Sequence, residues 1–408
     1  MKEVVKRFLK YASIDTQGNE AVLTCPSNEN QRLLAELLQD ELQNMGIEDV
    51  YLDDKSYVYA RIPSNAVKGV PSLAFFAHMD TTPDIPGDNI KTKIVENYDG
   101  EKIILNKGAG VTLDPKEFPV LKKYTGHDLL VADGTTVLGA EGKAGVAEIM
   151  EAARYLSEHP EVRHGEVYLV FTPDEELGYS TEYINMKKVP AKFGYTVDEG
   201  ECGELNYENF NAATATVTVK GSSTHPGHAR KRMKNAILLA NEFLNLLPKH
   251  EIPEQTEGYE GYYHILDMIG GVEQCRMTFS IRDFEEKGYE YRKKRLTEAA
   301  DYLNGYYGKD TFKVEIEDYY LNMKRKVDEY PEILDVAREA MLRAGIEPVE
   351  KPIRGGTDGV AISFMGLPCP NIFSGCHNGQ SVKEFISAQT MEKSVEVILN
   401  IIKIFTEK

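Results

Sequence analysis

The chain of 408 residues has few cysteines and no long apolar run, and each absence excludes a class of protein. Its five cysteines are scattered and never stand in Cys-x-x-Cys spacing. This pattern excludes a disulfide scaffold and a thiolate zinc site, and it favours reduced cysteines in a cytoplasmic protein. No window approaches about 18 consecutive apolar residues, so the sequence predicts no transmembrane helix.

Positive charge is also in deficit, because 47 basic residues face 65 acidic ones and the net charge is −18. This balance argues against nucleic acid or an anionic membrane as a partner. The apolar fraction of 42% and the charged fraction of 27% are those of an ordinary soluble globular protein. At the N-terminus, charges interrupt the apolar residues of segment 1–9, which predicts an amphipathic helix and not a signal peptide.

The length exceeds what one hydrophobic core usually serves, so we expect two domains. Residues 1–208 and 320–408 alternate helix-period segments with short apolar runs, which is typical of an α/β layer fold. Residues 209–319 follow the order β-α-β-β-α-β, which indicates a ferredoxin-like unit. The sequence therefore predicts a discontinuous α/β catalytic domain with an inserted α+β lid.

Two apolar β-like runs end in residues suited to metal chemistry. His78-Met79-Asp80 follows the first run, and Glu175-Glu176 follows the second after a short Pro-Asp turn. Ligands gather beyond the carboxyl ends of strands in open α/β sheets. A histidine, a nearby Asp to accept its other ring N–H and a Glu pair are what a divalent metal and a water-activating base require. The structural alternatives are a core histidine beside a helix-capping Asp and a solvated acidic turn.

Two further carboxylates stand where strands or turns end. Glu141 lies in a glycine-rich turn that opens a helix, and this turn lacks the Gly-Lys-Ser/Thr ending of a phosphate loop. Asp198 ends another apolar run. One imidazole with several oxygen ligands suits Zn²⁺, with Mn²⁺ or Co²⁺ as tolerable substitutes.

In these strand-end and turn residues, the chain resembles the peptidase T family of tripeptide aminopeptidases. That family belongs to the co-catalytic zinc metallopeptidases, which also include carboxypeptidase G2-like enzymes and aminoacylases. The resemblance covers essentially the whole chain, and it is most specific in segments 171–176, 208–213, 256–261 and 353–359. It implies a mixed-sheet zinc-peptidase catalytic domain, a lid that also dimerises the protein, and cytoplasmic hydrolysis of tripeptides.

The resemblance also implies roles for the strand-end residues. His78 and Asp198 would hold one zinc ion, with Asp80 orienting His78. Glu176 would hold a second zinc ion. Glu175 would be the general base that activates the water held by zinc, and the N-terminal residue of a tripeptide would then be released.

Further roles follow from the same resemblance. Glu141 would bridge both zinc ions, and Gln380 stands where the family has a zinc-binding histidine. In the lid, His225 would stabilise the oxyanion, and Arg354 would clamp the terminal carboxylate of the peptide. The expected partners are small peptides, most simply tripeptides, and a second copy of the chain bound through the lid.

The sequence departs from the family at the metal site. The family has Gly-Ala-Asp-Asp-Lys where this chain has Gly139-Ala140-Glu141-Gly142-Lys143, and it has Gly at the position of Glu199. A carboxamide such as Gln380 is also a poorer Zn²⁺ donor than imidazole. These changes leave an alternative open: a catalytically impaired homologue that binds peptides without efficient turnover.

Overall fold

The computed structural model describes residues 2–66 and 69–408. It divides into two compact units. Unit 1 comprises Met1–Tyr207, Arg325–Lys351 and Thr357–Lys408, and unit 2 comprises Glu208–Lys324 and Pro352–Gly356.

The segment Pro352–Gly356 belongs to unit 2. The sequence predicts that all of residues 320–408 belong to the catalytic domain. The reason is backbone pairing. Ile353 forms a parallel bridge with Asn209, and its N–H donates to the carbonyl of Glu208 at 2.8 Å. A local sequence pattern contains no sign of this long-range contact.

Unit 1 contains both helices and strands, as expected for an α/β layer fold. Its helices are α1 (Glu3–Ala12), α2 (Glu29–Asn44), α3 (Lys143–Glu158), α6 (Lys324–Val327, at the unit boundary), α7 (Pro331–Arg343), α8 (Asp358–Phe364) and α9 (Ala388–Glu407). Its strands are β1 (Asp49–Leu52), β2 (Val58–Ile62), β3 (Leu73–His78), β4 (Lys93–Val95), β5 (Ile103–Asn106), β6 (Val111–Leu113), β7 (Leu129–Val131), β8 (Val167–Thr172), β9 (Phe193–Asp198), β10 (Glu204–Asn206), β15 (Val349–Glu350), β16 (Asn371–Phe373), β17 (Cys376–His377) and β18 (Phe385–Ser387).

The main sheet of unit 1 has eight strands in the order β1-β2-β8-β3-β9-β16-β10-β15. Strands β8, β3, β9 and β16 run parallel, whereas β2 and β10 are antiparallel to their neighbours β8 and β16. Every residue of β3 and β8 is buried, as expected for strands covered on both faces. The predicted mixed α/β fold is therefore confirmed.

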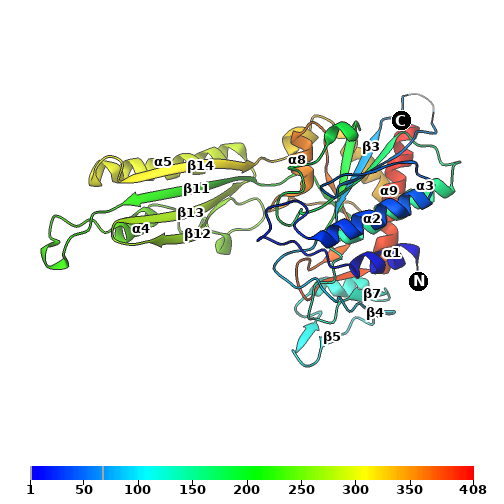
Figure 1. Cartoon of the computed structure of the whole chain (residues 1–408), viewed down its shortest axis with the longest axis horizontal. Helices are drawn as coiled ribbons and strands as arrows, with labels where there is room; N and C mark the ends of the chain where they lie inside the picture. The colour runs from blue at the N-terminus through cyan, green and yellow to red at the C-terminus, as the bar shows by residue number, and fades with distance from the viewer. Residues whose placement is uncertain (1, 67–68) are drawn as a thin grey trace. The chain divides into compact units, whose positions relative to one another are not determined.

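Helix α3 packs against β3 and β9, and α1 and α9 pack on α3 (Figure 1). Helix α2 begins after Asn28, whose side chain caps it by accepting a hydrogen bond from the N–H of Asn30. Its buried residues Leu34, Leu38 and Leu42 recur every four residues and form one apolar face. A second buried cluster lies where α8 meets β3 and β8, and it includes Phe76, Val170 and Ile362.

Unit 2 contains β11 (Asn211–Lys220), α4 (Ala236–Asn245), β12 (Tyr262–Gly270), β13 (Gln274–Asp283), α5 (Glu286–Tyr307) and β14 (Phe312–Tyr320). Its four strands are antiparallel in the order β12-β13-β11-β14, with α4 and α5 packed against the sheet. This is the predicted ferredoxin-like arrangement (Figure 1). Its core includes Val217, Phe243, Phe279 and Leu296.

Among the residues that the structure describes, no helix combines the length and the apolar character needed to cross a membrane.

Candidate metal centre

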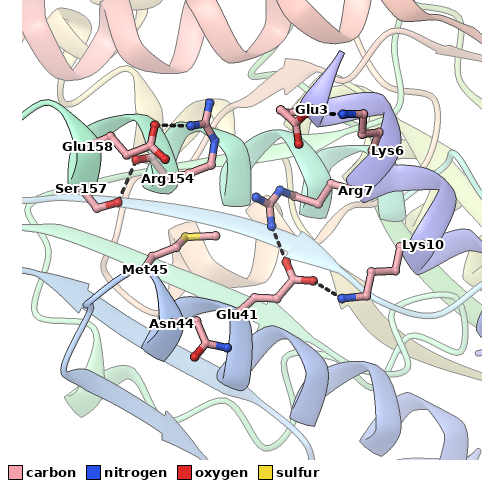
Figure 2. A pocket seen from close by; sticks show the side chains of 10 residues that line it. All are labelled: Glu3, Lys6, Arg7, Lys10, Glu41, Asn44, Met45, Arg154, Ser157 and Glu158. Atoms are coloured by element: carbon pink, nitrogen blue, oxygen red, sulfur yellow. Dashed lines mark hydrogen bonds and ion pairs between the residues drawn. The ribbon is translucent and has the colours of Figure 1, made fainter. Parts of the chain in front are cut away.

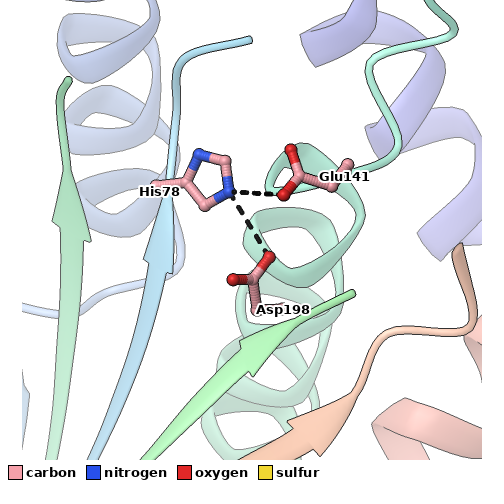
Figure 3. Close-up of side chains that lie close together, drawn as sticks. All are labelled: His78, Glu141 and Asp198. Carbon is pink, nitrogen blue, oxygen red and sulfur yellow. Dashed lines mark ion pairs between the residues drawn. The ribbon is translucent and has the colours of Figure 1, made fainter. Parts of the chain in front are cut away.

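The centre forms at the carboxyl ends of the neighbouring parallel strands β3 and β9. His78 is the last residue of β3, and Asp198 is the last residue of β9. Because parallel strands end at the same edge of the sheet, the two side chains meet there. The Nε2 atom of His78 lies 3.4 Å from an oxygen of Asp198 (Figure 3).

Glu141 joins this pair from the loop before α3. One of its carboxylate oxygens is 3.7 Å from Nε2 of His78, and the donor atoms of His78, Glu141 and Asp198 all lie within 4.8 Å of one another. A glycine makes this approach possible. A Cβ atom at Gly145 would lie 1.9 Å from the carbonyl oxygen of Val197, so only glycine lets α3 start so close to β9.

Asp80 connects the imidazole to the loop that follows β8. Its carboxylate lies 3.3 Å from Nδ1 of His78, and it also accepts hydrogen bonds from the N–H groups of Glu175 and Glu176, both at 3.0 Å. The Asp80 side chain is fully buried. One carboxylate thus contacts the ring of the histidine and fixes the backbone of both glutamates.

The turn that presents Glu175 and Glu176 depends on Asp174, which sequence reasoning did not single out. Asp174 has a positive φ of 53° and is fully buried. Its carboxylate accepts hydrogen bonds from the N–H of Ser27 and from the side chain of Gln31 on α2, both at 2.7 Å. These bonds hold a strained turn in place so that the next two side chains enter the centre.

The centre concentrates negative charge in a low-dielectric environment. Burial raises the pKa of Glu175 well above its ordinary value. Burial and the neighbouring Glu141 carboxylate raise the pKa of Glu176 to about 11. Burial alone would lower the pKa of His78, but Glu141 and Asp198 reverse this and raise it well above its ordinary value. Burial and the neighbouring carboxylates thus favour the protonated forms of Glu175 and Glu176.

The donor atoms fit a metal ion. Within residues 2–66 and 69–408, the buried atoms Nε2 of His78 and Oε1 of Glu176 have no hydrogen-bond partner. Buried polar atoms are normally paired, so an unpaired imidazole nitrogen and an unpaired carboxylate oxygen in one cluster are what a metal-binding site presents. One imidazole with carboxylate oxygens is a donor set for Zn²⁺, Mn²⁺ or Co²⁺.

Gln380 lies in the turn between β17 and β18, and it reaches this cluster. Its side-chain amide donates to Oε2 of Glu176 at 2.7 Å. His377, three residues earlier, is engaged elsewhere, because its Nε2 atom is 2.6 Å from the hydroxyl of Tyr124 and its ring stacks on Phe385. Burial lowers the pKa of His377 to about 4. His377 is therefore engaged with Tyr124 and Phe385.

Gly142 packs directly against the imidazole of His78. This glycine has a φ of +78°, and a Cβ atom on it would lie 2.4 Å from Cε1 of His78. An aspartate at position 142 would collide with the imidazole of His78. The backbone after Glu141 therefore lies directly against the histidine ring.

Unit 2 carries the two residues predicted to bind substrate. His225 lies in an exposed loop, and its Nδ1 atom accepts a hydrogen bond from the N–H of Gly227 at 3.2 Å. Arg354 donates to the carbonyl of Gly258 at 2.6 Å and to the hydroxyl of Thr256 at 3.1 Å, and it lies over the ring of Phe210. The guanidinium thus holds the loop that contains Thr256 and Gly258, a contact that the sequence did not reveal.

Asp358 is a further residue whose role sequence reasoning missed, although it lies within the quoted segment 353–359. It is buried, and it accepts hydrogen bonds from Thr172 at 3.1 Å and from Ser180. These two residues flank the loop that contains Glu175, so Asp358 closes the loop at both ends. Burial raises the pKa of Asp358 to about 6.

Known proteins match both unit 2 and the whole chain. Residues 207–311 match the peptidase dimerisation domain family. The whole chain is 48% identical to peptidase T of Clostridium acetobutylicum over 408 residues, which is all of both chains. It is 50% identical to peptidase T of Halothermothrix orenii over the same length and 49% identical to that of Geobacillus kaustophilus over 407 residues, covering 99% of the latter.

Solved structures share the fold. The crystal structure of an aminopeptidase from Bacillus cereus matches with a TM-score of 0.78 at 23% identity, over 100% of this chain and 98% of that one. A dinuclear metal-binding peptidase of the M20 family from Bacillus subtilis matches with a TM-score of 0.68 at 14% identity, over 100% and 99% of the two chains. At these identities the likeness concerns the fold.

Proposed function

Because the chain belongs to the peptidase T family, we propose that it is a metal-dependent aminopeptidase that releases the N-terminal residue of tripeptides. The observation that carries the proposal is the likeness to peptidase T along the full length of the chain. The alternative, a homologue that binds peptides without efficient turnover, is not favoured by this likeness.

We assign the metal ligands from the geometry of the cluster. His78 and Asp198 would hold one ion, and Glu176 with Gln380, which is hydrogen-bonded to it, would hold the second. Glu141 lies between them, because its carboxylate approaches Nε2 of His78 and also raises the pKa of Glu176. We propose Zn²⁺ as the metal, two ions per subunit. When bound, the metal polarises the scissile carbonyl and makes a nearby water more acidic.

The protein's own side chains then complete the reaction. Glu175 takes a proton from the attacking water and returns it to the leaving amine. Asp80 keeps the ring of His78 and the backbone of Glu175 in place through its hydrogen bonds. From the family resemblance we propose that His225 stabilises the developing oxyanion and that Arg354 binds the peptide carboxylate.

We further propose a cytoplasmic homodimer that associates through unit 2. The unit corresponds to the peptidase dimerisation domain match. Strand β12 is an edge of its sheet and exposes a row of apolar residues, among them Leu266, Met268 and Ile269. An exposed apolar edge strand in water favours pairing with another chain. A second copy of this strand offers the same apolar row and unpaired backbone groups.

The proposed activity is tested with purified protein loaded with Zn²⁺, Mn²⁺ or Co²⁺ and a panel of tripeptides, dipeptides and N-acetylated tripeptides. We expect free N-terminal amino acid from the tripeptides and none from the acetylated ones. Absence of hydrolysis throughout the panel, with metal bound, would overturn the proposal. In that case the double substitution Glu141→Asp with Gln380→His shows whether the departures from the family motif are responsible.

A further inference from the structure

A buried carboxylate in the turn after β17 holds the backbone of the loop that presents Glu141. Glu384 is 1% exposed, and its carboxylate accepts hydrogen bonds from four consecutive N–H groups. These bonds measure 2.7 Å from Leu138, 2.9 Å from Gly139, 2.7 Å from Ala140 and 2.7 Å from Glu141. Successive N–H groups that converge on one anion form a concave anion-binding turn. Here the anion is part of the protein itself.

The burial of the Glu384 carboxylate has a free-energy cost, which its hydrogen bonds to the loop offset. Burying a carboxylate is unfavourable without strong compensating bonds. A carboxylate that accepts backbone N–H bonds forms charge-assisted hydrogen bonds, which are roughly twice as strong as neutral ones. Each oxygen of Glu384 accepts two of them. The four bonds leave the backbone of residues 138–141 little freedom to move.

The buried amine of Lys143 lies against the same loop. A Cβ atom on Gly139 would lie 3.0 Å from Cε of Lys143 and 3.4 Å from its Nζ. The Nζ atom donates to the carbonyl of Ile14 at 3.1 Å, which fixes the amine in this position. The loop is thus enclosed by a carboxylate that binds its N–H groups and by a fixed lysine side chain.

The turn that carries Glu384 also carries Gln380 and touches Glu141 directly. A Cβ atom on Gly379 would lie 2.9 Å from Cγ of Glu141, so the turn packs against the stem of that side chain. The thiol of Cys376 lies 3.4 Å from the Glu384 carboxylate on the other side. Two segments that are far apart in the chain are therefore joined at the carboxylate of Glu384.

We infer that Glu384 is a positioning residue of the metal centre, which holds the backbone of residues 138–141 so that Glu141 reaches both His78 and Glu176. This inference rests on the proposed function, because it requires the cluster to bind metal. Glu384 itself touches neither substrate nor metal and acts only through the loop. Without its four bonds the backbone of Glu141 is free to turn, and the shared ligand loses its fixed direction.

The substitution Glu384→Gln tests this inference. Glutamine has nearly the same shape, but its NH2 group only donates, so one of the two positions that accept N–H groups is lost while the carbonyl oxygen keeps the other. We expect Zn²⁺ affinity to fall about 10-fold to 100-fold, the usual cost of losing a residue that supports a metal ligand. Affinity is measured by titrating the metal-free protein against a competing chelator, and the visible absorption of bound Co²⁺ reports the ligand geometry.

Glu148→Gln provides a matched control in the same unit. Glu148 is also a fully buried glutamate, but in the described part of the chain its side chain accepts its hydrogen bond from the hydroxyl of Ser394 at 2.6 Å and not from the N–H groups of residues 138–141. Both variants are examined well below their unfolding temperatures, as judged by circular dichroism. We expect Glu148→Gln to keep the Zn²⁺ affinity and the Co²⁺ spectrum of the unsubstituted protein.

The outcomes separate this inference from the proposed function. Equal Zn²⁺ affinity in Glu384→Gln and Glu148→Gln would overturn the role of Glu384. Failure of the unsubstituted protein to bind any metal would instead overturn the proposed function. If Glu384→Gln does not fold, Glu384→Asp replaces it, because aspartate keeps the charge but is one methylene too short to reach all four N–H groups. Zn²⁺ affinity of the folded Asp variant equal to that of Glu148→Gln would also refute the inference.

Discussion

The polar pocket lined by α1, α2 and α3 (Figure 2) and the metal centre (Figure 3) are both rich in carboxylates, yet only the pocket also supplies the cations. In the pocket, Arg7 and Lys10 pair with Glu41, and Arg154 pairs with Glu158. Each of these carboxylates has a basic partner from its own or a neighbouring helix. The helical pocket is therefore neutralised by the chain itself.

In the metal centre, the acidic side chains that the structure describes lack the lysine and arginine partners that acidic side chains have in the pocket. Five carboxylates surround a single imidazole, and in the described part of the chain none of the five forms an ion pair with lysine or arginine within 4.0 Å; they are Asp80, Glu141, Glu175, Glu176 and Asp198. Buried charges of one sign are stable only when a cation or protons balance them. The comparison teaches that charge balance, and not the number of acidic residues, distinguishes a metal site from a salt-bridged surface.

The largest effect is expected for Glu175→Gln in the metal centre. General acid–base catalysis typically contributes a factor of about 10² to 10⁴ to the rate. We expect kcat for tripeptide hydrolysis to fall by about that factor while Zn²⁺ affinity stays close to normal, since Glu175 is not a ligand. Steady-state kinetics and metal titration provide the two values. A variant with unchanged kcat would show that another group moves the proton.

Gly142→Ala tests whether the close contact between position 142 and the ring of His78 matters for metal binding. The new Cβ would lie 2.4–2.6 Å from ring atoms of His78, so we expect Zn²⁺ affinity to fall at least about 10-fold. Gly46→Ala is the matched control, because Gly46 also has a positive φ of 83° but has nothing within 4 Å of the added Cβ. The control is expected to lose about 1 kcal/mol of stability and no metal affinity. Equal metal affinities in the two variants would contradict the contact with His78.

The pH dependence of stability tests the uncompensated charge directly. Burial, with Asp198 and Glu141 adding to it, raises the pKa of Glu199 to about 8 from 4.5, and Glu176 is raised further. The folded protein thus keeps protons that the unfolded chain releases above pH 4.5. The free energy of unfolding of the metal-free protein is therefore expected to fall as pH rises from about 4.5 through about 8.

Urea unfolding at pH 5, 6.5 and 8 measures this fall, with chelated and Zn²⁺-loaded protein side by side. Bound metal supplies the missing positive charge, so the loaded protein is expected to lose less stability over the same range. The helical pocket contributes equally to both samples. Identical pH profiles for the two samples would show that the carboxylates are balanced in some other way.

The smallest effect is expected for Lys10→Ala in the helical pocket. Lys10 is half exposed, its Nζ lies 2.6 Å from Glu41, and Glu41 keeps Arg7 as a partner. Exposed ion pairs contribute about 0.2–1 kcal/mol, so a loss of that size is expected in urea unfolding. Zn²⁺ affinity should not change. A change in metal affinity would mean that the two clusters are coupled.

The sequence predicted those parts of the centre that depend on local patterns. His78 and Asp198 directly end apolar runs, and the ends of parallel strands meet by the geometry of the sheet. Glu175 and Glu176 follow a third apolar run after a short turn. For these residues the local pattern and the overall fold lead to the same position.

The supporting contacts could not be predicted, because each joins segments that are distant in the chain. Asp174 is fixed by Ser27 and Gln31, which lie 147 and 143 residues away. Glu384 binds N–H groups 243 to 246 residues away. A single sequence shows no period or spacing that reports such contacts. The predicted roles of His225, Arg354 and Gln380 stay predictions that the experiments above address.

The most direct test of the account is the metal content of the purified protein, measured by elemental analysis after dialysis against Zn²⁺ and removal of free metal. We predict two Zn²⁺ ions per chain, held by His78, Asp198 and Glu176 with Glu141 shared between them. The helical pocket, whose lining carboxylates each pair with a basic side chain, should contribute none. Fewer than two ions per chain would contradict the claim that the carboxylates at the strand ends form a two-metal centre.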